Sequence, residues 1–267
     1  MINLTDDEFV DIVHFVKLNY GINLVNKRQL IESRMYSVLV EKGMDNFSDY
    51  IKIIKQKNSD EITVMLNKLT TNHTYFMRES AHFDFLKNIA LPELVTIKKN
   101  KEMRIWSAGC SSGEEAYSTV MVIKDFLGAQ SNLWDYRILA TDISANAINK
   151  SQCAVYDDLI KDLKPEWINK YFSLQDGTGY VLNQEIKKEV IFQKFNLMDK
   201  FPFQQPFDII FCRNVMIYFD EPTKISLINK FYEVLRPGGY LFIGLSESIR
   251  REESKFKYIQ PSVYKKE

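Results

Sequence analysis

A glycine-containing turn between a strand-like run and a helix-like stretch constrains the fold of this chain more than any other feature. Met103–Ala108 is apolar and of strand length, Gly109–Gly113 follows it, and apolar residues at helical spacing continue to Leu127. Gly109 permits a sharp turn, and Gly113 lets the backbone come close to a ligand. A strand that enters a helix through such a turn predicts a parallel sheet covered by helices.

The alternation of strands and helices continues from about residue 80 to the end of the sequence. Further strands are predicted at Arg137–Thr141, Phe207–Cys212 and Tyr240–Gly244, the last entered through Pro237-Gly238-Gly239, and Tyr258–Lys265 is predicted as a closing edge strand. This pattern predicts an α/β fold with a Rossmann-like, mostly parallel sheet. Ligands then bind at the carboxyl ends of the strands.

Residues from about 171 to 192 depart from this alternation. Phe172–Gln175 and Tyr180–Leu182 have the pattern of a hairpin, joined by the turn-rich segment Asp176–Gly179. Val190–Gln193 either adds a third strand to the hairpin or begins the next strand of the main sheet. We therefore expect a small antiparallel β insertion here.

Residues 1–70 predict a helical amino-terminal domain, and residues 71–267 the domain that contains the sheet. Thr5 and Glu8 have capping-box spacing, and four segments with apolar residues at helical period follow without strand alternation. Residues 25–57 carry seven basic residues against four acidic ones. This excess is either the solvated face of surface helices or a docking surface for an acidic protein partner.

The overall composition excludes several classes of function. The 35 basic and 35 acidic residues cancel, so the chain has no bulk attraction to nucleic acid or anionic lipid. It contains no apolar run of the roughly 18 residues that a membrane-spanning helix needs, and its acidic start lacks a secretory pattern. We expect a cytoplasmic monomer with no direct membrane insertion and no nucleic-acid partner.

Cysteine and histidine usage argues against a metal enzyme. The three cysteines (Cys110, Cys153 and Cys212) include no C-x-x-C pair, which fits a reducing compartment and excludes a disulfide framework. The three histidines (His14, His73 and His82) do not form a metal-ligand spacing on one element. No metal is expected.

Acidic residues at two positions favour a positively charged ligand over a dinucleotide. Glu114 and Glu115 open the helix after the glycine turn, where the helix dipole favours acids, and they place negative charge in the pocket. That charge is hostile to a pyrophosphate and suits the ammonium and sulfonium groups of S-adenosylmethionine. Asp142 ends the next strand and is predicted to accept the ribose hydroxyls, the alternative being an N-cap of the following helix.

Two further blocks flank the glycine turn in the sequence. Thr70–Glu79 reads TTNHTYFMRE and precedes the turn, whereas Phe211–Phe219 reads FCRNVMIYF and lies far downstream. With Trp106–Glu115 between them, these blocks resemble those of the CheR-type chemotaxis receptor (protein-glutamate) O-methyltransferases, and the resemblance covers about residues 5–265. It implies a class I S-adenosylmethionine-dependent methyltransferase sheet, S-adenosylhomocysteine as product, and the cytoplasmic helices of methyl-accepting chemotaxis receptors as partners. The amino-terminal domain would dock the receptor.

The resemblance also implies the residues of the site. The cofactor-binding positions are Asn72, Thr74, Arg78, Glu115, Asp142, Asn196, Leu197, Arg213 and Asn214, with Gly109 in the turn. Tyr218 lies in the matching FCRNVMIYF block and is implied as a catalytic residue that walls the reactive end, where its ring would face the sulfonium. Met77 and Ala116 depart from the family pattern, in which Phe and Pro are common at these positions, and both changes stay apolar.

The expected reaction needs no general base. A glutamate carboxylate is already ionised at neutral pH, so the enzyme must mainly align the carboxylate oxygen, the methyl carbon and the leaving sulfur. Arg78 is predicted to be the key polar residue, since a guanidinium orients a carboxylate without losing its charge. Whether it holds the substrate or the cofactor stays open, and the alternative role is a structural ion pair with Glu79.

Parts of the sequence also match motifs of other functions. Gly109–Gly113 fits the G-x-S-x-G nucleophile elbow, but that fold needs a histidine after Ser111 and all three histidines precede it. A nicotinamide dehydrogenase would lack its G-x-G-x-x-G motif. A methyltransferase with another substrate, and an S-adenosylmethionine-binding sensor or docking module without turnover, remain as alternatives.

In some CheR-type proteins the β insertion holds the carboxyl-terminal tail of a receptor. The connection at Asp176–Gly179 is short here. We therefore expect tail binding to be weak or absent.

Overall fold

The computed structural model describes residues 2–56, 58–70, 73–157, 160, 163–175 and 179–267. The chain divides into two compact units. The first comprises residues 1–72 and 218–224, and the second comprises residues 73–217 and 225–267. Each unit is described by itself below.

The first unit is helical, as the sequence predicts. It contains α1 (Asp6–Tyr20), α2 (Arg28–Glu41), α3 (Phe47–Lys55) and α4 (Ser59–Leu69). The capping box at the start of α1 is confirmed, since Thr5 accepts a hydrogen bond from the Glu8 backbone and the Glu8 side chain accepts one from the Thr5 backbone. Apolar side chains from the four helices form its core, including Ile12, Ile31, Phe47, Ile54 and Met65.

A second, distant segment completes this unit. The Asn23 backbone N–H donates to the Tyr218 carbonyl at 2.7 Å, and Ile22 forms an isolated antiparallel bridge with Phe219. Lys17 Nζ lies 2.7 Å from Asp220, and this hydrogen-bonded ion pair lowers the pKa of the Asp220 carboxyl to about 2. The helical unit therefore includes residues that the sequence places almost 150 positions after its last helix.

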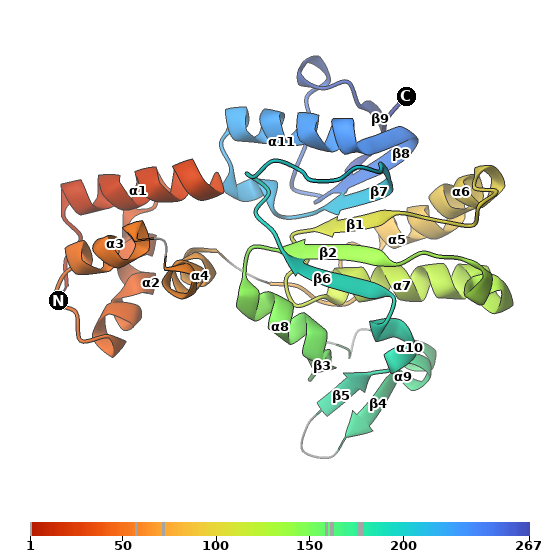
Figure 1. The fold of residues 1–267 in the computed structure, drawn as a ribbon, viewed down its shortest axis with the longest axis horizontal. Helices are drawn as coiled ribbons and strands as arrows, with labels where there is room; N and C mark the ends of the chain where they lie inside the picture. Colours follow the sequence, from red (N-terminus) through yellow and green to blue (C-terminus); the bar gives the residue numbers. More distant parts are fainter. Residues whose placement is uncertain (1, 57, 71–72, 158–159, 161–162, 176–178) are drawn as a thin grey trace. The chain divides into compact units, whose positions relative to one another are not determined.

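The second unit is built on a seven-stranded sheet with the order β6-β2-β1-β7-β8-β10-β9 among the described residues (Figure 1). Its strands are β1 (Ile105–Ala108), β2 (Ile138–Asp142), β6 (Val190–Lys194), β7 (Phe207–Cys212), β8 (Leu235–Ile243), β9 (Lys257–Gln260) and β10 (Val263–Lys265). The pairs from β6 through to β8 are parallel, whereas β10 runs antiparallel to both β8 and β9. The Rossmann-like sheet is confirmed. From β1 the chain adds β2 and β6 on one side, and it then returns to add β7 and β8 on the other side of β1.

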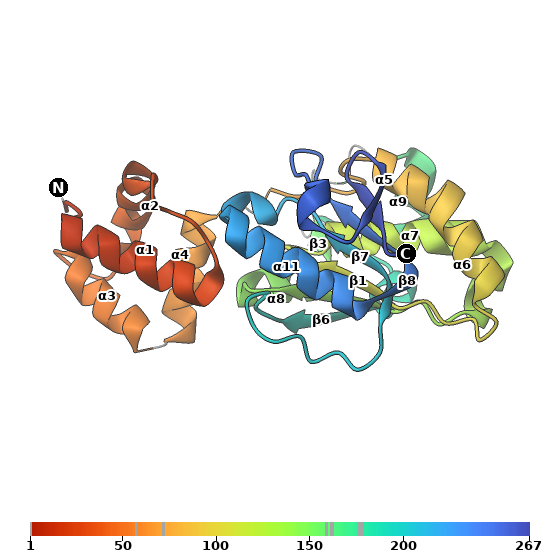
Figure 2. The ribbon, with the colours of Figure 1, turned by 90° about the horizontal axis from the view of Figure 1, so that it is seen from above.

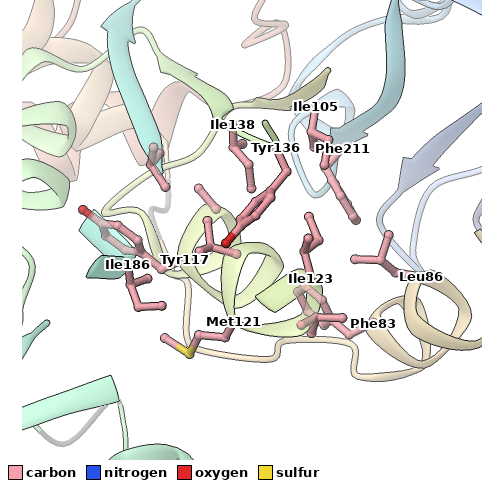
Figure 3. Close-up of a cluster of buried hydrophobic side chains, with 14 of the residues drawn as sticks. Phe83, Leu86, Ile105, Tyr117, Met121, Ile123, Tyr136, Ile138, Ile186 and Phe211 are labelled. Atoms are coloured by element: carbon pink, nitrogen blue, oxygen red, sulfur yellow. The ribbon is translucent and has the colours of Figure 1, made fainter. Parts of the chain in front are cut away.

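One face of the sheet is covered by α7 (Glu114–Leu127) and by a helical run that precedes β1. Figure 2 shows this unbroken run, which consists of α5 (Ala81–Phe85), the π-helical turn η1 (Leu86–Ala90) and α6 (Leu91–Ile97). Figure 3 shows how Phe83, Leu86 and Ile123 from these helices meet the strand residues Ile105 and Phe211. All five are at most 1% exposed, so burial of this face anchors the strands that carry the site.

On the opposite face of the sheet, the connection from β6 to β7 is a loop that contains no helix. Residues 195–206 contain no helix, and their rings Phe201 and Phe203 pack edge-on against Trp106 with centroids 5.0 and 4.8 Å away. Phe231 of α11 (Glu221–Val234) packs on the same indole at 5.4 Å. Aromatic side chains of a loop thus replace the helix that usually covers such a sheet.

The small antiparallel insertion is also confirmed, but its third strand comes from a segment outside the predicted residues. Its strands are β3 (Val155–Tyr156), β4 (Phe172–Gln175) and β5 (Gly179–Leu182), in the order β3-β5-β4. Val190–Lys194 is β6 of the main sheet, so the third strand comes from before the hairpin. Strands β4 and β5 project away from the main sheet (Figure 1).

Two strands at the carboxyl-terminal edge differ from the prediction. β8 begins at Leu235 and therefore includes Pro237-Gly238-Gly239, with a shift of register against β7. The predicted single edge strand Tyr258–Lys265 is wrong, because the chain turns at Ser262, whose φ of 63° is left-handed, and forms the hairpin β9–β10. The remaining short elements are α8 (Ala145–Cys153), α9 (Pro165–Tyr171), α10 (Gln184–Lys187), η2 (Gly128–Leu133), η4 (Met216–Tyr218) and η5 (Arg251–Glu253).

Candidate functional site

The glycine turn after β1 is fixed between the ends of two neighbouring strands. The backbone N–H groups of Gly109 and Cys110 donate to the Thr141 carbonyl of β2 at 2.7 and 2.9 Å. Gly109 has a φ of 90°, and a Cβ there would overlap Cγ2 of Val215. Gly113 has a φ of 97°, and a Cβ there would lie 2.8 Å from Cβ of Ser151. No larger residue fits either position without displacement of a neighbour.

Asp142 lies beside this turn at the carboxyl end of β2. Its Oδ2 accepts from the Ser111 backbone N–H at 2.8 Å, and its Oδ1 accepts from the Ser144 backbone N–H at 2.9 Å. Burial raises the pKa of the Asp142 carboxyl, and these backbone hydrogen bonds oppose that rise. The N-cap of α8 is Ser144, whose hydroxyl accepts from the Ala147 backbone N–H. Because a carboxylate has about four acceptor sites, Asp142 can accept from a ligand donor as well as from these backbone groups.

The two acids that open α7 have different surroundings. Glu115 is inside the site: its Oε1 accepts from the Ser107 hydroxyl at 2.6 Å, and its Oε2 lies 3.2 Å from NH1 of Arg213. Burial raises the pKa of the Glu115 carboxyl, while Arg213 and Ser107 act to lower it. Glu114 accepts from the Ser112 hydroxyl at 2.9 Å instead and is fully buried. Of these two acids, only Glu115 contacts other residues of the site, and Arg213 balances its charge.

Arg213 follows β7 and is enclosed by protein groups. Its side chain is 2% exposed, and besides Glu115 it pairs with Glu79, whose Oε2 lies 3.2 Å from NH2. The same NH2 donates to the carbonyl of Arg78. The guanidinium also lies over the ring of Phe83, 5.6 Å from its centroid. Its donors are thus directed at the helix α7 and at the segment before α5.

Glu79 joins that segment to the ends of both β7 and β8. Its Oε1 accepts from Nδ2 of Asn214 at 3.3 Å, and its Oε2 accepts from the Leu245 backbone N–H at 3.2 Å. Nδ1 of the buried His82 lies 3.4 Å from the same Oε2. Burial, assisted by the charge of Arg213, lowers the pKa of His82 to about 4, so the imidazole is neutral at pH 7. Glu79 itself has a φ of 57°, a conformation that costs energy in a non-glycine residue.

Glu247 holds the turn that follows β7. Its carboxylate accepts three backbone N–H groups, from Gly244 at 2.6 Å, Asn214 at 3.0 Å and Ile217 at 3.1 Å. Burial raises the pKa of Glu247, and these hydrogen bonds oppose the rise. Because Asn214 has a φ of 58°, this carboxylate stabilises a turn that would otherwise be unfavourable.

Arg78 is the cation of this region that has no carboxylate partner among the described residues. Its NH1 donates to the carbonyl of His73. The structural ion pair with Glu79 does not form, because Glu79 pairs with Arg213. Arg78 is partly exposed, so its remaining donors are available to a ligand carboxylate.

The residues at this edge of the sheet fit S-adenosylmethionine. Asp142 and Glu115 supply carboxylate acceptors for hydroxyl and ammonium groups beside the glycine turn. The amide oxygen of Asn214 is buried and accepts no hydrogen bond from the residues that the structure describes. A buried acceptor without a partner is costly, which is consistent with a ligand donor at this position.

Comparison with known proteins decides the family. The model described as the CheR methyltransferase SAM binding domain matches residues 72–265, and the model described as the CheR methyltransferase all-alpha domain matches residues 7–70.

The chain belongs to the CheR methyltransferase family. It is 45% identical to the chemotaxis protein methyltransferase of Borreliella burgdorferi, over 99% of this chain and 96% of that protein. It is 35% identical to the chemotaxis protein methyltransferase of Escherichia coli, over 98% and 91% of the two chains, and 32% identical to chemotaxis protein methyltransferase 1 of Pseudomonas aeruginosa, over 93% and 92%. A class I, S-adenosylmethionine-dependent methyltransferase fold follows for this CheR protein.

The other residues implied by the CheR resemblance lie on further segments of the chain or outside the described residues. Asn196 and Leu197 follow β6; Oδ1 of Asn196 accepts from the Met198 backbone N–H at 3.0 Å, and Leu197 is buried. Thr74 is partly buried in the segment before α5. Tyr218 belongs to the first unit, and its ring is not assigned to the site. Asn72 lies outside the described residues.

Sequence reasoning missed the two partly buried carboxylates that organise the β7 side of the CheR site, Glu79 and Glu247. Glu79 stood inside the quoted TTNHTYFMRE block, but it was considered only as a partner of Arg78. Glu247 had no signal beyond its place after a predicted strand.

The described residues include no group of side chains suited to a metal ion. No helix within the described part of the chain has the length and apolar character to span a membrane.

Proposed function

We propose that this CheR protein transfers the methyl group of S-adenosylmethionine to glutamate side chains of methyl-accepting chemotaxis receptors. The observation that carries the proposal is the arrangement around Arg78: its backbone is fixed by Arg213, and its guanidinium has no carboxylate partner among the described residues. The relatives support a chemotaxis substrate, since each is named as a chemotaxis protein methyltransferase.

The residues of the site would hold both reactants. When bound, S-adenosylmethionine supplies an electrophilic methyl group, which the glutamate oxygen attacks while the carbon–sulfur bond breaks to leave S-adenosylhomocysteine. Asp142 would accept the ribose hydroxyls, and Glu115 with Asn214 would accept donors of the amino-acid end. Arg78 would orient a carboxylate through charge-assisted hydrogen bonds. Tyr218 remains proposed as the aromatic wall of the reactive end.

This chemistry needs no general base. The glutamate oxygen is deprotonated at pH 7, and no proton is transferred when the ester forms. The histidine nearest to this network is His82, which is buried, neutral and placed against Glu79. Alignment and charge balance are therefore the contributions that this chain has to make.

The amino-terminal unit is proposed to dock the cytoplasmic helices of the receptor. Its basic excess is smaller on the surface than in the sequence, because Arg28, Lys42 and Lys55 pair with Asp6, Glu61 and Asp11. Part of the basic charge is therefore balanced by acids of the same unit, and exposed pairs of this kind add little stability. Docking is proposed to depend on shape as well as on charge.

Tail binding by the small sheet is proposed to be weak or absent. Gln175 of β4 pairs with Gly179 of β5, so the connection is short, although its residues 176–178 lie outside the described part of the chain. Calorimetric titration with peptides from receptor carboxyl termini should show no binding at micromolar concentration. A micromolar dissociation constant would contradict the proposal.

The function is tested by incubating the protein with methyl-labelled S-adenosylmethionine and membranes rich in chemoreceptors. Label on receptors that alkali releases as volatile methanol would establish carboxyl methyl esters. Cofactor binding without transfer to receptors would favour another acceptor, or a binding module without turnover.

A further inference from the structure

One carboxylate lies where three segments of the methyltransferase unit converge. Glu79 accepts from the Asn214 side chain after β7 and from the Leu245 backbone after β8, and it pairs with Arg213. Its own side chain is 12% exposed. A carboxylate at neutral pH is an acceptor only, so every neighbour must direct a donor toward it.

This requirement fixes the direction of the Asn214 amide. Asn214 must direct its NH2 group at Glu79, and the distance from Nδ2 to Oε1 is 3.3 Å. Its oxygen then points away from Glu79, and this oxygen is buried without a hydrogen-bond donor among the described residues.

The surroundings leave the Asn214 side chain little freedom to rearrange. Glu247 accepts from the Asn214 backbone N–H at 3.0 Å and holds the turn. Gly244 lies against the amide, and a Cβ at that position would be 2.6 Å from Nδ2 of Asn214. The amide is therefore confined by backbone on one side and by a carboxylate on another.

We propose that Glu79 is a positioning residue that sets the hydrogen-bond polarity of Asn214 and so presents the amide oxygen to a donor group of the bound cofactor. The donor is an ammonium, amino or hydroxyl group of S-adenosylmethionine. The inference rests on the proposed function, to which it adds the residue that orients a cofactor contact. The same carboxylate, through Arg213, also fixes the backbone of Arg78.

A cycle of three variants tests this polarity. Glu79→Gln keeps the shape but can direct an NH2 group at residue 214, so the amide loses its imposed direction. Asn214→Asp places two carboxylates against each other. The double variant Glu79→Gln/Asn214→Asp restores a donor facing an acceptor and again leaves one oxygen for the ligand, while the total charge stays that of the wild type.

The readouts are calorimetric affinity for S-adenosylhomocysteine and, with receptor membranes, kcat and KM for the cofactor. We expect Glu79→Gln to weaken binding about tenfold and Asn214→Asp about 100-fold, since each disturbs a hydrogen bond to a charged group. The double variant should recover at least about tenfold over Asn214→Asp, because the donor–acceptor match returns. Thermal unfolding of each variant confirms that it is folded.

Glu93→Gln is the matched control. Like Glu79, Glu93 accepts from a neutral side-chain donor and pairs with a cation, here the Tyr240 hydroxyl at 2.7 Å and Lys265 at 2.7 Å, but it lies on α6. Its affinity should equal that of the wild type. Wild-type-like binding by Glu79→Gln, or a double variant no better than Asn214→Asp, would overturn the positioning role alone. A wild-type protein that binds no S-adenosylhomocysteine would overturn the proposed function with it.

Discussion

The β2 side of the candidate site is held by backbone groups, whereas the β7 side is held by charged side chains. Near β2, the turn at Gly109–Gly113 donates to Thr141, and Asp142 accepts backbone N–H groups from both adjoining loops. Near β7, Arg213 is enclosed by Glu79 and Glu115. The first side is built from two consecutive strand ends, whereas the second joins Arg213 to residues 98 and 134 positions earlier in the sequence.

We therefore expect substitutions on the two sides to affect different properties of the protein. Loss of a group on the β2 side removes contacts to a ligand and loosens one turn. Loss of a group on the β7 side leaves buried charges without partners, and that cost falls on the fold itself. The predictions below use this difference, from the largest expected effect to the smallest.

Arg213→Met should destabilise the protein most. The change removes a cation that is 2% exposed and leaves Glu79 and Glu115, which are 12% and 13% exposed, without it; breaking such a largely buried pair costs about 3–5 kcal/mol. Urea unfolding at pH 7 measures the loss. Lys170→Met is the control, because Lys170 pairs with Asp125 at the surface and should cost less than about 1 kcal/mol. Equal losses in the two variants would remove the distinction between the two sides.

Arg78→Ala should abolish most turnover and leave the fold intact. Its guanidinium makes no ion pair with a described residue, so the cost should fall on the reaction, by about 100- to 1,000-fold in rate. Initial rates with receptor membranes, together with thermal unfolding, check both parts. Arg137→Ala is matched, because Arg137 pairs with Asp135 at the other end of β2 and should leave the rate unchanged. Wild-type rates in Arg78→Ala would remove Arg78 from the mechanism.

His82 should make stability depend on pH on the β7 side. Its folded pKa of about 4 lies below its ordinary value of 6.5, so between these values the unfolded chain takes up a proton that the folded chain does not. Its contribution is fully present above pH 6.5 and is lost as the pH falls to 4, about 3 kcal/mol in all.

His82→Phe keeps a ring against Phe242 and removes the titration. Urea unfolding of both proteins across this pH range isolates the effect, because the carboxyl groups titrate in both. Stability curves that run parallel would show that His82 does not contribute.

Asp142→Ala should weaken binding of S-adenosylhomocysteine by about 10- to 100-fold, since it removes a charged acceptor. Ser144→Ala is the control on the same side: it removes the N-cap of α8 and should cost about 1 kcal/mol of stability without loss of affinity. Calorimetry and thermal unfolding separate the two. An unchanged dissociation constant in Asp142→Ala would limit Asp142 to holding its two loops.

The fold was predictable from the sequence wherever a local pattern decides the structure. Glycine spacing, the capping box of Thr5 and Glu8, and the apolar runs of β1, β2 and β7 each act over a few residues. Prediction failed for β3, which joins a hairpin that lies after it in the chain, so its partner is not visible in local sequence. It also failed at the local hairpin β9–β10, because Ser262 takes the left-handed conformation of the turn without a glycine to mark it.

The candidate site divides in the same way. Asp142 and Glu115 were identified because a strand end and a helix start fix their positions within a few residues of the turn. Glu79 and Glu247 were missed, because their function is set by partners on other segments. The assignment of Tyr218–Lys224 to the helical unit was equally hidden.

By itself the sequence determined the alternation of strands and helices, the helical amino-terminal region and the family, because these depend on periodicity and on residues close to one another along the chain. Only the tertiary structure decided that Glu79 pairs with Arg213 in place of Arg78, and that the oxygen of Asn214 is left as an acceptor. The physical reason is that buried charges and amides take their orientation from the nearest donors and acceptors in space, and folding brings these from distant segments.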